Sequence, residues 1–219
     1  MGRLSDASNA TFLCRLGDAE AGPLCVYKPV KGERPLDDFP SHTLARREVA
    51  AHLLSEVAGW RIVPPTILRD GPFGAGMAQA WIEPDPEIDV VELVLRADER
   101  LRRICLFDAL ANNADRKGGH LLATDAGHVW GVDHGICFAV EPKLRTVLWQ
   151  WRGEALDEAE IGVVRRVRSD LDGALGAALG DLLSAAEVAA SVRRADALLA
   201  DGRFPMPDPL RPAVPWPPY

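Results

Sequence analysis

The sequence predicts a small α+β fold with two lobes, and two observations lead to this prediction. In the first 83 residues, short runs of strand-forming residues alternate with turn signals and surround one segment of helical propensity. From residue 84 onward, apolar residues recur mainly at helical spacing. We therefore expect an N-terminal lobe over residues 1–83 with an antiparallel sheet and one helix, a mainly helical C-terminal lobe over residues 84–203, and a proline-rich tail over residues 204–219.

The composition limits the classes of function. A chain of 219 residues with 47% hydrophobic and 26% charged residues is globular and can bury one substantial core. Its net charge of −7 gives no overall basic field, so we expect no nucleic-acid partner. No apolar stretch approaches the roughly 20 residues that span a bilayer, so we expect no stable membrane insertion. The four cysteines lack any C-x-x-C spacing, which favours free thiols in a reducing cytoplasm.

Four strands are expected in the first lobe. Residues 11–16 and 24–29 flank a turn rich in glycine and acidic residues, which predicts a hairpin. Residues 63–68 and 75–82 flank the turn 69–72 in the same way. The helix of this lobe is expected over residues 44–57, with Gly59 ending it.

The second lobe begins with helical patterns over residues 88–94 and 99–110, and two more are expected over residues 157–171 and 184–199. Ser184 stands three residues before Glu187, as in a capping box. Asn112 and Asn113 are expected to cap the helix before them. The tail is too rich in proline for a helix, so it either lies along the body through Trp216 and Tyr219 or is disordered.

Two aspartates stand beside short strand-like segments, and they are the best candidates for chemistry. Asp115 opens D-R-K-G-G-H-L-L, and Asp133 lies in V-D-H-G, directly after the run 129–132. Phosphoryl transfer needs one carboxylate to orient the acceptor and another to hold Mg²⁺. The alternative is that both aspartates only cap turns.

A lysine on a strand and a glutamate on the following helix complete this set. Lys28 follows Val26 and Tyr27, so its ammonium can project from the sheet toward a nucleotide, and Glu48 can hold it in place. The alternative is a solvated lysine and a helix-face glutamate paired with His52.

One ordered set of residues resembles the phosphatidylinositol 3-/4-kinase-like group of the protein-kinase-like enzymes: Lys28, Glu48, Asp115, Lys117 and Asp133. The sequence around these residues is similar to that of uncharacterised actinobacterial proteins assigned to the same group. The resemblance covers about residues 8–152. It implies a kinase-like fold, an ATP site with Lys28 and Glu48, catalytic roles for Asp115 and Lys117, and a metal aspartate at Asp133. His120 stands where these families usually have an asparagine that binds metal, and an imidazole is a softer ligand than Mg²⁺ prefers.

The same resemblance locates the rest of the nucleotide site. The loop over the phosphates falls on Ser8 and Asn9, which lack a Gly-x-Gly pattern, and Met1 begins only just before it. Either the leading strand is very short, or the natural protein starts further upstream. Residues 79–83 are expected to line the adenine through backbone groups, with Gln79, Trp81 and Ile82 at the wall.

These residues lead to three hypotheses. The first is an ATP- and Mg²⁺-dependent kinase that phosphorylates a hydroxyl of an unknown protein or small molecule. The second is a nucleotide-binding pseudokinase that serves as a regulatory or interaction module, because His120 and the glycine-poor loop depart from the kinase pattern. The third is a transition-metal hydrolase with His120, His128, Asp133 and His134 as ligands, although no H-x-H or H-E-x-x-H spacing supports it.

Overall fold

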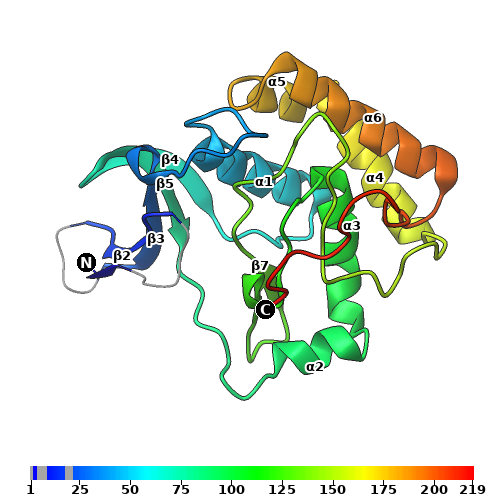
Figure 1. The fold of residues 1–219 in the computed structure, drawn as a ribbon, viewed down its shortest axis with the longest axis horizontal. Coiled ribbons are helices and arrows are strands. Elements are labelled where there is room, and N and C mark those ends of the chain that lie inside the picture. Colours follow the sequence, from blue (N-terminus) through cyan, green and yellow to red (C-terminus); the bar gives the residue numbers. More distant parts are fainter. Residues whose placement is uncertain (1, 4–8, 18–21) are drawn as a thin grey trace.

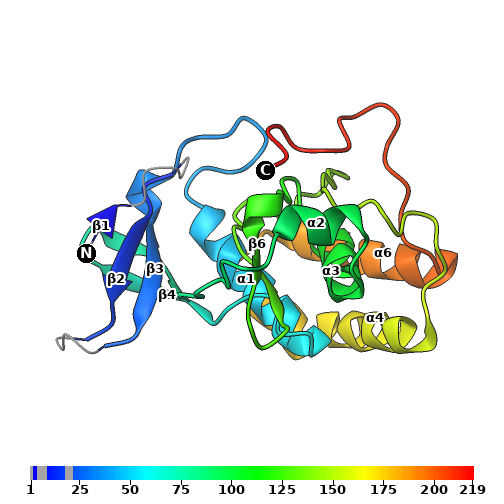
Figure 2. The same cartoon turned by 90° about the horizontal axis from the view of Figure 1, so that it is seen from below.

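A five-stranded sheet and a group of helices lie side by side, which confirms the two-lobed α+β prediction (Figure 1). This computed structural model describes residues 2–3, 9–17 and 22–219. Figure 2 shows the sheet at one end of the molecule and α3, α4 and α6 at the other, with α1 between them.

The sheet is antiparallel, with the strand order β1-β2-β3-β5-β4. Its strands are β1 (Gly2–Arg3), β2 (Phe12–Arg15), β3 (Leu24–Pro29), β4 (Thr66–Gly71) and β5 (Gly74–Ala80). The hairpins predicted at residues 11–29 and 63–82 are both present. In β3, side chains alternate between faces, so Cys25, Tyr27 and Pro29 are buried while Lys28 lies on the opposite face from Tyr27. This alternation aims Lys28 at the helix that follows.

Helix α1 (Leu44–Ala58) carries Glu48 and joins the two lobes. A short 3₁₀ helix, η1 (Val30–Gly32), precedes the loop that leads to it. The Glu33 carboxylate accepts hydrogen bonds from the N–H groups of Leu44 and Ala45 at 3.3 and 2.9 Å, which satisfies the first turn of α1. At the other end, Gly59 adopts φ 71° and ends the helix as predicted. The buried face of α1 belongs to the same apolar core as the helical lobe.

The helical lobe is built from five α-helices, and the four helical segments predicted there are present with small shifts at their ends. The helices are α2 (Val90–Leu95), α3 (Arg102–Ala111), α4 (Glu158–Leu171), α5 (Ala174–Gly180) and α6 (Ala185–Asp201), with the 3₁₀ helices η2 (Glu99–Leu101) and η3 (Gly118–His120). The capping box at Ser184 and Glu187 is present, and Asn112 caps α3 with φ 52°. Helix α5 was not predicted because its sequence is glycine-rich, and it is held by the buried side chains of Leu175 and Leu179.

A buried ion pair fastens α1 to α6. The guanidinium of Arg47 bonds to the Glu187 carboxylate and also donates to Cys137 O at 2.7 Å. One large apolar cluster then runs from α1 through α3, α4 and α5 to Phe204. Helix α1 therefore shares one apolar core with the helical lobe, and Glu48 lies on this helix.

Between α3 and α4 lies the segment that carries both candidate aspartates. It contains the small hairpin β6 (Leu121–Ala123) and β7 (Val129–Gly131), which pair antiparallel. Asp115 precedes this hairpin, and Asp133 follows it by two residues. The hairpin thereby brings the two aspartates to the same end of the lobe.

The proline-rich tail lies along the body and ends at the loop after Asp115. Ala213 O accepts hydrogen bonds from Thr146 N at 3.1 Å and from Trp149 Nε1 at 2.8 Å. Pro218 O accepts one from Gly118 N at 2.8 Å, and the Tyr219 ring packs on Gly118. Trp216 is 86% exposed, so of the two aromatic anchors predicted for the tail only Tyr219 packs on the body.

All four cysteines are free thiols. Within the described ranges, no helix is both long and apolar enough to cross a membrane.

Candidate functional site

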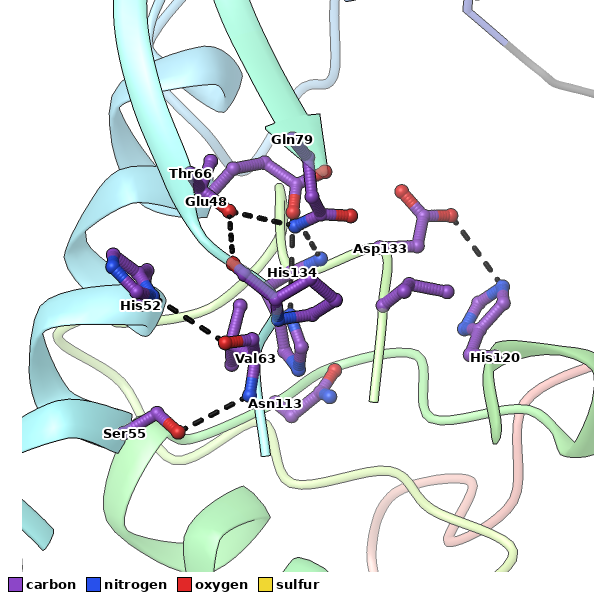
Figure 3. Close-up of polar contacts among 12 residues, drawn as sticks. Glu48, His52, Ser55, Val63, Thr66, Gln79, Asn113, His120, Asp133 and His134 are labelled. Atoms are coloured by element: carbon purple, nitrogen blue, oxygen red, sulfur yellow. Dashed lines mark hydrogen bonds and ion pairs between the residues drawn. The ribbon is translucent and has the colours of Figure 1, made fainter. Parts of the chain in front are cut away.

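Lys28, Glu48 and Asp133 meet between the sheet and the helical lobe. Lys28 Nζ lies 2.6 Å from Glu48 Oε1 and 2.7 Å from Asp133 Oδ1. The predicted pairing of a strand lysine with a helix glutamate is thus present. The alternative pairing of Glu48 with His52 is not, because His52 Nδ1 lies 3.3 Å from Val63 O instead (Figure 3).

Glu48 has a second bond that fixes the loop around Asp133. Its Oε2 accepts a hydrogen bond from the backbone N–H of His134 at 2.9 Å. Burial opposes the charge on Lys28, but Asp133 and Glu48 outweigh it and raise the pKa of the ammonium. The cation at position 28 is therefore permanent at neutral pH, as a group that binds phosphates needs to be.

Asp133 presents a carboxylate that is both paired and accessible. Its side chain is 49% exposed, and the nearby Lys28 ammonium holds its pKa well below the usual range. Asp133 itself adopts φ 62°, a left-handed conformation that is uncommon for a residue with a side chain. Two residues later, a Cβ added at Gly135 would lie 3.3 Å from Leu44 Cβ, so glycine at this position allows the close approach to α1.

His120 faces Asp133, as Figure 3 shows. The Nε2 of His120 lies 3.4 Å from Asp133 Oδ2, while Nδ1 accepts the Lys117 N–H at 3.4 Å. Burial lowers the pKa of His120, so the imidazole is neutral near pH 7. One accessible carboxylate and one neutral imidazole fit a divalent ion that takes its remaining ligands from phosphates and water.

The transition-metal alternative requires four side chains to converge, and they do not. His128 Nε2 bonds to Arg61 O at 2.9 Å, and His134 Nε2 bonds to Arg116 Nη2 at 2.6 Å. Among the residues that the structure describes, no three histidine, cysteine or acidic side chains are grouped to hold a metal. His120, His128, Asp133 and His134 therefore do not form the ligand set of a zinc-type hydrolase.

Asp115 lies between two cations. Lys117 Nζ is 3.5 Å from its Oδ2, and Arg145 Nη2 is 3.9 Å from its Oδ1. The Asn113 side chain accepts the Asp115 N–H at 3.0 Å, which fixes the start of the loop. Burial raises the pKa of Asp115, and Lys117 opposes this effect. Such a carboxylate can accept a proton from a hydroxyl beside it.

The residues expected to contact the nucleotide differ in burial and in their hydrogen-bond partners. The buried Gln79 side chain donates to Thr66 Oγ1 at 2.9 Å (Figure 3), and Gln79 lies in β5 between Val26 of β3 and Thr66 of β4. Trp81 N donates to Leu24 O at 3.1 Å, and Trp81 Nε1 bonds to Glu83. Ile82 is partly exposed directly beyond β5. Asn9 Oδ1 accepts the Arg34 N–H at 2.8 Å, and Ser8 lies outside the described residues.

The sequence analysis did not predict the buried ion pair between Arg116 and Asp108. Arg116 and Asp108 are 0% exposed and lie 2.9 Å apart, from Nη2 to Oδ1. The only signal in the sequence was Asp108 itself, because a lone carboxylate in the apolar run of α3 requires a buried partner. Nothing in the sequence pointed to Arg145.

Comparison with known proteins supports this description at two levels. Protein Rv2133c of Mycobacterium tuberculosis (strain ATCC 25618 / H37Rv) is 46% identical, and the match covers 100% of this chain and 91% of that protein. The crystal structure of the Helicobacter pylori proinflammatory kinase CtkA matches with a TM-score of 0.55 and 12% identity, over 93% of this chain and 91% of that one. No family profile matches the sequence. The structural likeness shows that the fold is kinase-like, which confirms the predicted fold. It does not show membership of the narrower phosphatidylinositol 3-/4-kinase-like group.

Proposed function

Because this chain belongs to the family of the mycobacterial protein Rv2133c and has a kinase-like fold, we propose that it is an ATP- and Mg²⁺-dependent phosphotransferase. The acceptor is a hydroxyl of a protein or a small molecule. One observation carries the proposal: Lys28 binds Glu48 and Asp133 together, at 2.6 and 2.7 Å, although the three residues come from separate parts of the chain.

The proposed roles follow from charge and position. Lys28, oriented by Glu48, would bind phosphate oxygens of ATP, and Asp133 with His120 would hold a Mg²⁺ ion that offsets the negative charge of the phosphates. Asp115 orients the acceptor hydroxyl and takes its proton, while Lys117 stabilises the charge that develops on the transferred group. The backbone of residues 79–83, with Trp81 and Ile82, lines the adenine, and the segment with Ser8 and Asn9 covers the phosphates.

The lobe boundaries are part of the same proposal. Residues 1–83 would form the nucleotide-binding lobe and residues 84–203 the lobe with the catalytic loop, with ATP between them. The likeness to the CtkA kinase supports this division at the level of the fold. A relation to the phosphatidylinositol 3-/4-kinase-like group and a cytoplasmic location remain predictions from the sequence.

Two variants separate the proposed roles. Asp115→Asn removes the proton acceptor but leaves the phosphate and metal groups, so ATP should bind normally while transfer is lost. Asp133→Ala removes the metal carboxylate, so ATP binding should lose its dependence on Mg²⁺. Asp125→Asn, at an exposed carboxylate in the turn between β6 and β7, is the matched control. Calorimetric titration with ATP and Mg²⁺ and a radiolabel transfer assay measure both effects, and unchanged transfer in Asp115→Asn and Asp133→Ala would reject the assignment.

A pseudokinase is the second candidate, and His120 is the observation that favours it. The Nδ1 of His120 accepts a hydrogen bond, so its Nε2 carries the proton, and this Nε2–H is directed at Asp133. The ring therefore has to rotate or change tautomer before one of its nitrogen lone pairs can bind a metal beside Asp133. The same two assays decide between the candidates. Mg²⁺-dependent ATP binding without transfer to any acceptor, including the protein itself, would favour the pseudokinase.

A further inference from the structure

A cavity of about 820 Å³ opens on the helical lobe. Its walls come from the loop after β7, the last turns of α6 and the proline-rich tail. Neither Lys28, Glu48 nor Asp133 lines it, so it is separate from the proposed ATP site. Its volume falls in the range of small-molecule sites, about 300–1,000 Å³.

Backbone pairing fixes this cavity beside Asp115. Arg145 N donates to Asn113 O at 2.9 Å, and Arg116 N donates to Arg145 O at 3.0 Å. Ala114 and Arg145 line the cavity, and the Arg145 guanidinium reaches to 3.9 Å from the Asp115 carboxylate. Arg145 therefore connects the wall of the cavity to the proposed catalytic carboxylate.

Most of the wall is apolar. Trp149 and Leu144 come from the loop, Leu198 comes from α6, and Phe204 and Met206 come from the beginning of the tail. The Trp149 indole is held in place by its hydrogen bond to Ala213 O. These side chains offer a surface for an aromatic or aliphatic body.

The charged groups of the wall favour an anion. Five basic and three acidic side chains line the cavity, an excess of two positive charges in a chain whose net charge is −7. Lys143 is neutralised by Asp38 at 2.6 Å, and Arg211 faces Asp208 at 3.6 Å. Arg145 has only the more distant Asp115, and its buried Nε–H has no hydrogen-bond partner in the described part of the chain. A buried donor of this kind is costly unless a ligand satisfies it.

We infer that this cavity is the acceptor site and that it takes a small organic anion with an apolar body and a hydroxyl group. Arg145 binds the carboxylate or phosphate of the ligand, and the hydroxyl is presented to Asp115. The inference rests on the proposed phosphotransferase activity. In the transfer, the hydroxyl oxygen bonds to the γ-phosphorus, the bond from that phosphorus to the β–γ bridging oxygen breaks, ADP leaves, and the hydroxyl proton passes to Asp115.

Binding is tested with two dyes of similar shape, anilinonaphthalene sulfonate and the uncharged phenylnaphthylamine. We expect the anion to bind one site, with about tenfold weaker affinity in Arg145→Gln, because a charge-assisted bond is lost. The neutral dye should bind both proteins equally. Ala197→Trp, at an exposed position of α6 that lines the cavity, should block both dyes, and Arg165→Gln on α4 should change nothing. Equal anion binding in wild type, Arg145→Gln and Ala197→Trp would overturn the inference.

Transfer is tested with labelled ATP and hydroxyphenyl carboxylic acids, each beside the corresponding neutral hydroxyphenyl alcohol. We expect label on the acids, a raised KM in Arg145→Gln and no transfer in Ala197→Trp. Transfer to protein or peptide hydroxyls that persists in Ala197→Trp would overturn the acceptor site but leave the proposed function intact. Loss of ATP binding in the wild type would instead reject the proposed function, whatever the dyes show.

Discussion

Arg116, which follows Asp115 in the proposed catalytic loop, forms an ion pair with Asp108 of α3 in which both side chains are 0% exposed. The same guanidinium donates to Val132 O at 3.0 Å and to the ring of His134 at 2.6 Å. It therefore holds the residues on both sides of Asp133. The ion pair connects α3, which is anchored in the core, to the residue proposed to bind metal.

Breaking this pair should destabilise the fold strongly. Asp108→Ala leaves the Arg116 charge buried without its carboxylate, and losses of this kind cost about 3–5 kcal/mol in the free energy of unfolding. Urea denaturation measures the change. Glu92→Ala removes an exposed carboxylate that lies 3.5 Å from Arg96, and it serves as the control with little expected effect. A loss in Asp108→Ala no larger than that in Glu92→Ala would contradict the structural role of the pair.

His134 should make the fold sensitive to mild acid. Burial and the Arg116 charge lower its pKa well below the ordinary value, so the native imidazole is neutral and its Nε2 accepts a hydrogen bond from Arg116 Nη2. Since the unfolded chain binds a proton near pH 6.5 and the native state does not, stability is full above about pH 6.5 and falls as pH drops toward the native pKa. The slope approaches about 1.4 kcal/mol per pH unit.

His134→Gln tests this pH dependence, because glutamine can still accept from Arg116 and does not titrate. Denaturation between about pH 7 and pH 5.5 should show a smaller decline in the variant than in the wild type. An equal decline in both proteins would show that other groups, such as His120, cause the acid sensitivity.

Lys28→Met should weaken ATP binding by at least about tenfold, because the phosphates lose a charge-assisted contact. The substitution also removes the cation that holds down the pKa of Asp133, so that pKa should rise. Calorimetry measures the affinity. Lys31→Met, three residues away and exposed, should bind ATP like the wild type, and an equal loss in both variants would indicate a general charge effect.

Tyr219→Ala should loosen the end of the tail. A Cβ at Gly118 would meet the Tyr219 ring, so this ring covers the backbone that donates to Pro218 O. Hydrogen exchange at the Gly118 amide should become faster in the variant. The Thr146 amide, held by Ala213 O, is the internal control and should keep its rate. Unchanged exchange at Gly118 would show that Tyr219 does not hold the tail end.

The parts that could be predicted from the sequence depend on local patterns. The alternation in β3, the stop at Gly59 and the Ser184–Glu187 capping box are each determined by a few neighbouring residues. The position of Lys28 followed from the same alternation, and its partner Glu48 followed from the family resemblance together with the helical pattern.

The remaining features depend on contacts between distant residues. The pairing of residues 113–116 with residues 145–147 places Arg145 beside Asp115, and no local pattern encodes this pairing. The tail contact at Gly118 and the left-handed backbone of Asp133 are likewise imposed by packing. Helix α5 was not predicted because its glycines lower the helix propensity of the segment, whereas the burial of Leu175 and Leu179 stabilises it.

A crystal structure with a non-hydrolysable ATP analogue and Mg²⁺ would test directly whether Lys28 and Asp133 form the ATP site. Lys28 should keep its bond to Glu48 but leave Asp133 to contact phosphate oxygens, and Asp133 should bind the ion. A nucleotide bound elsewhere, with the contacts of Lys28 to Glu48 and Asp133 unchanged at 2.6 and 2.7 Å, would contradict this prediction.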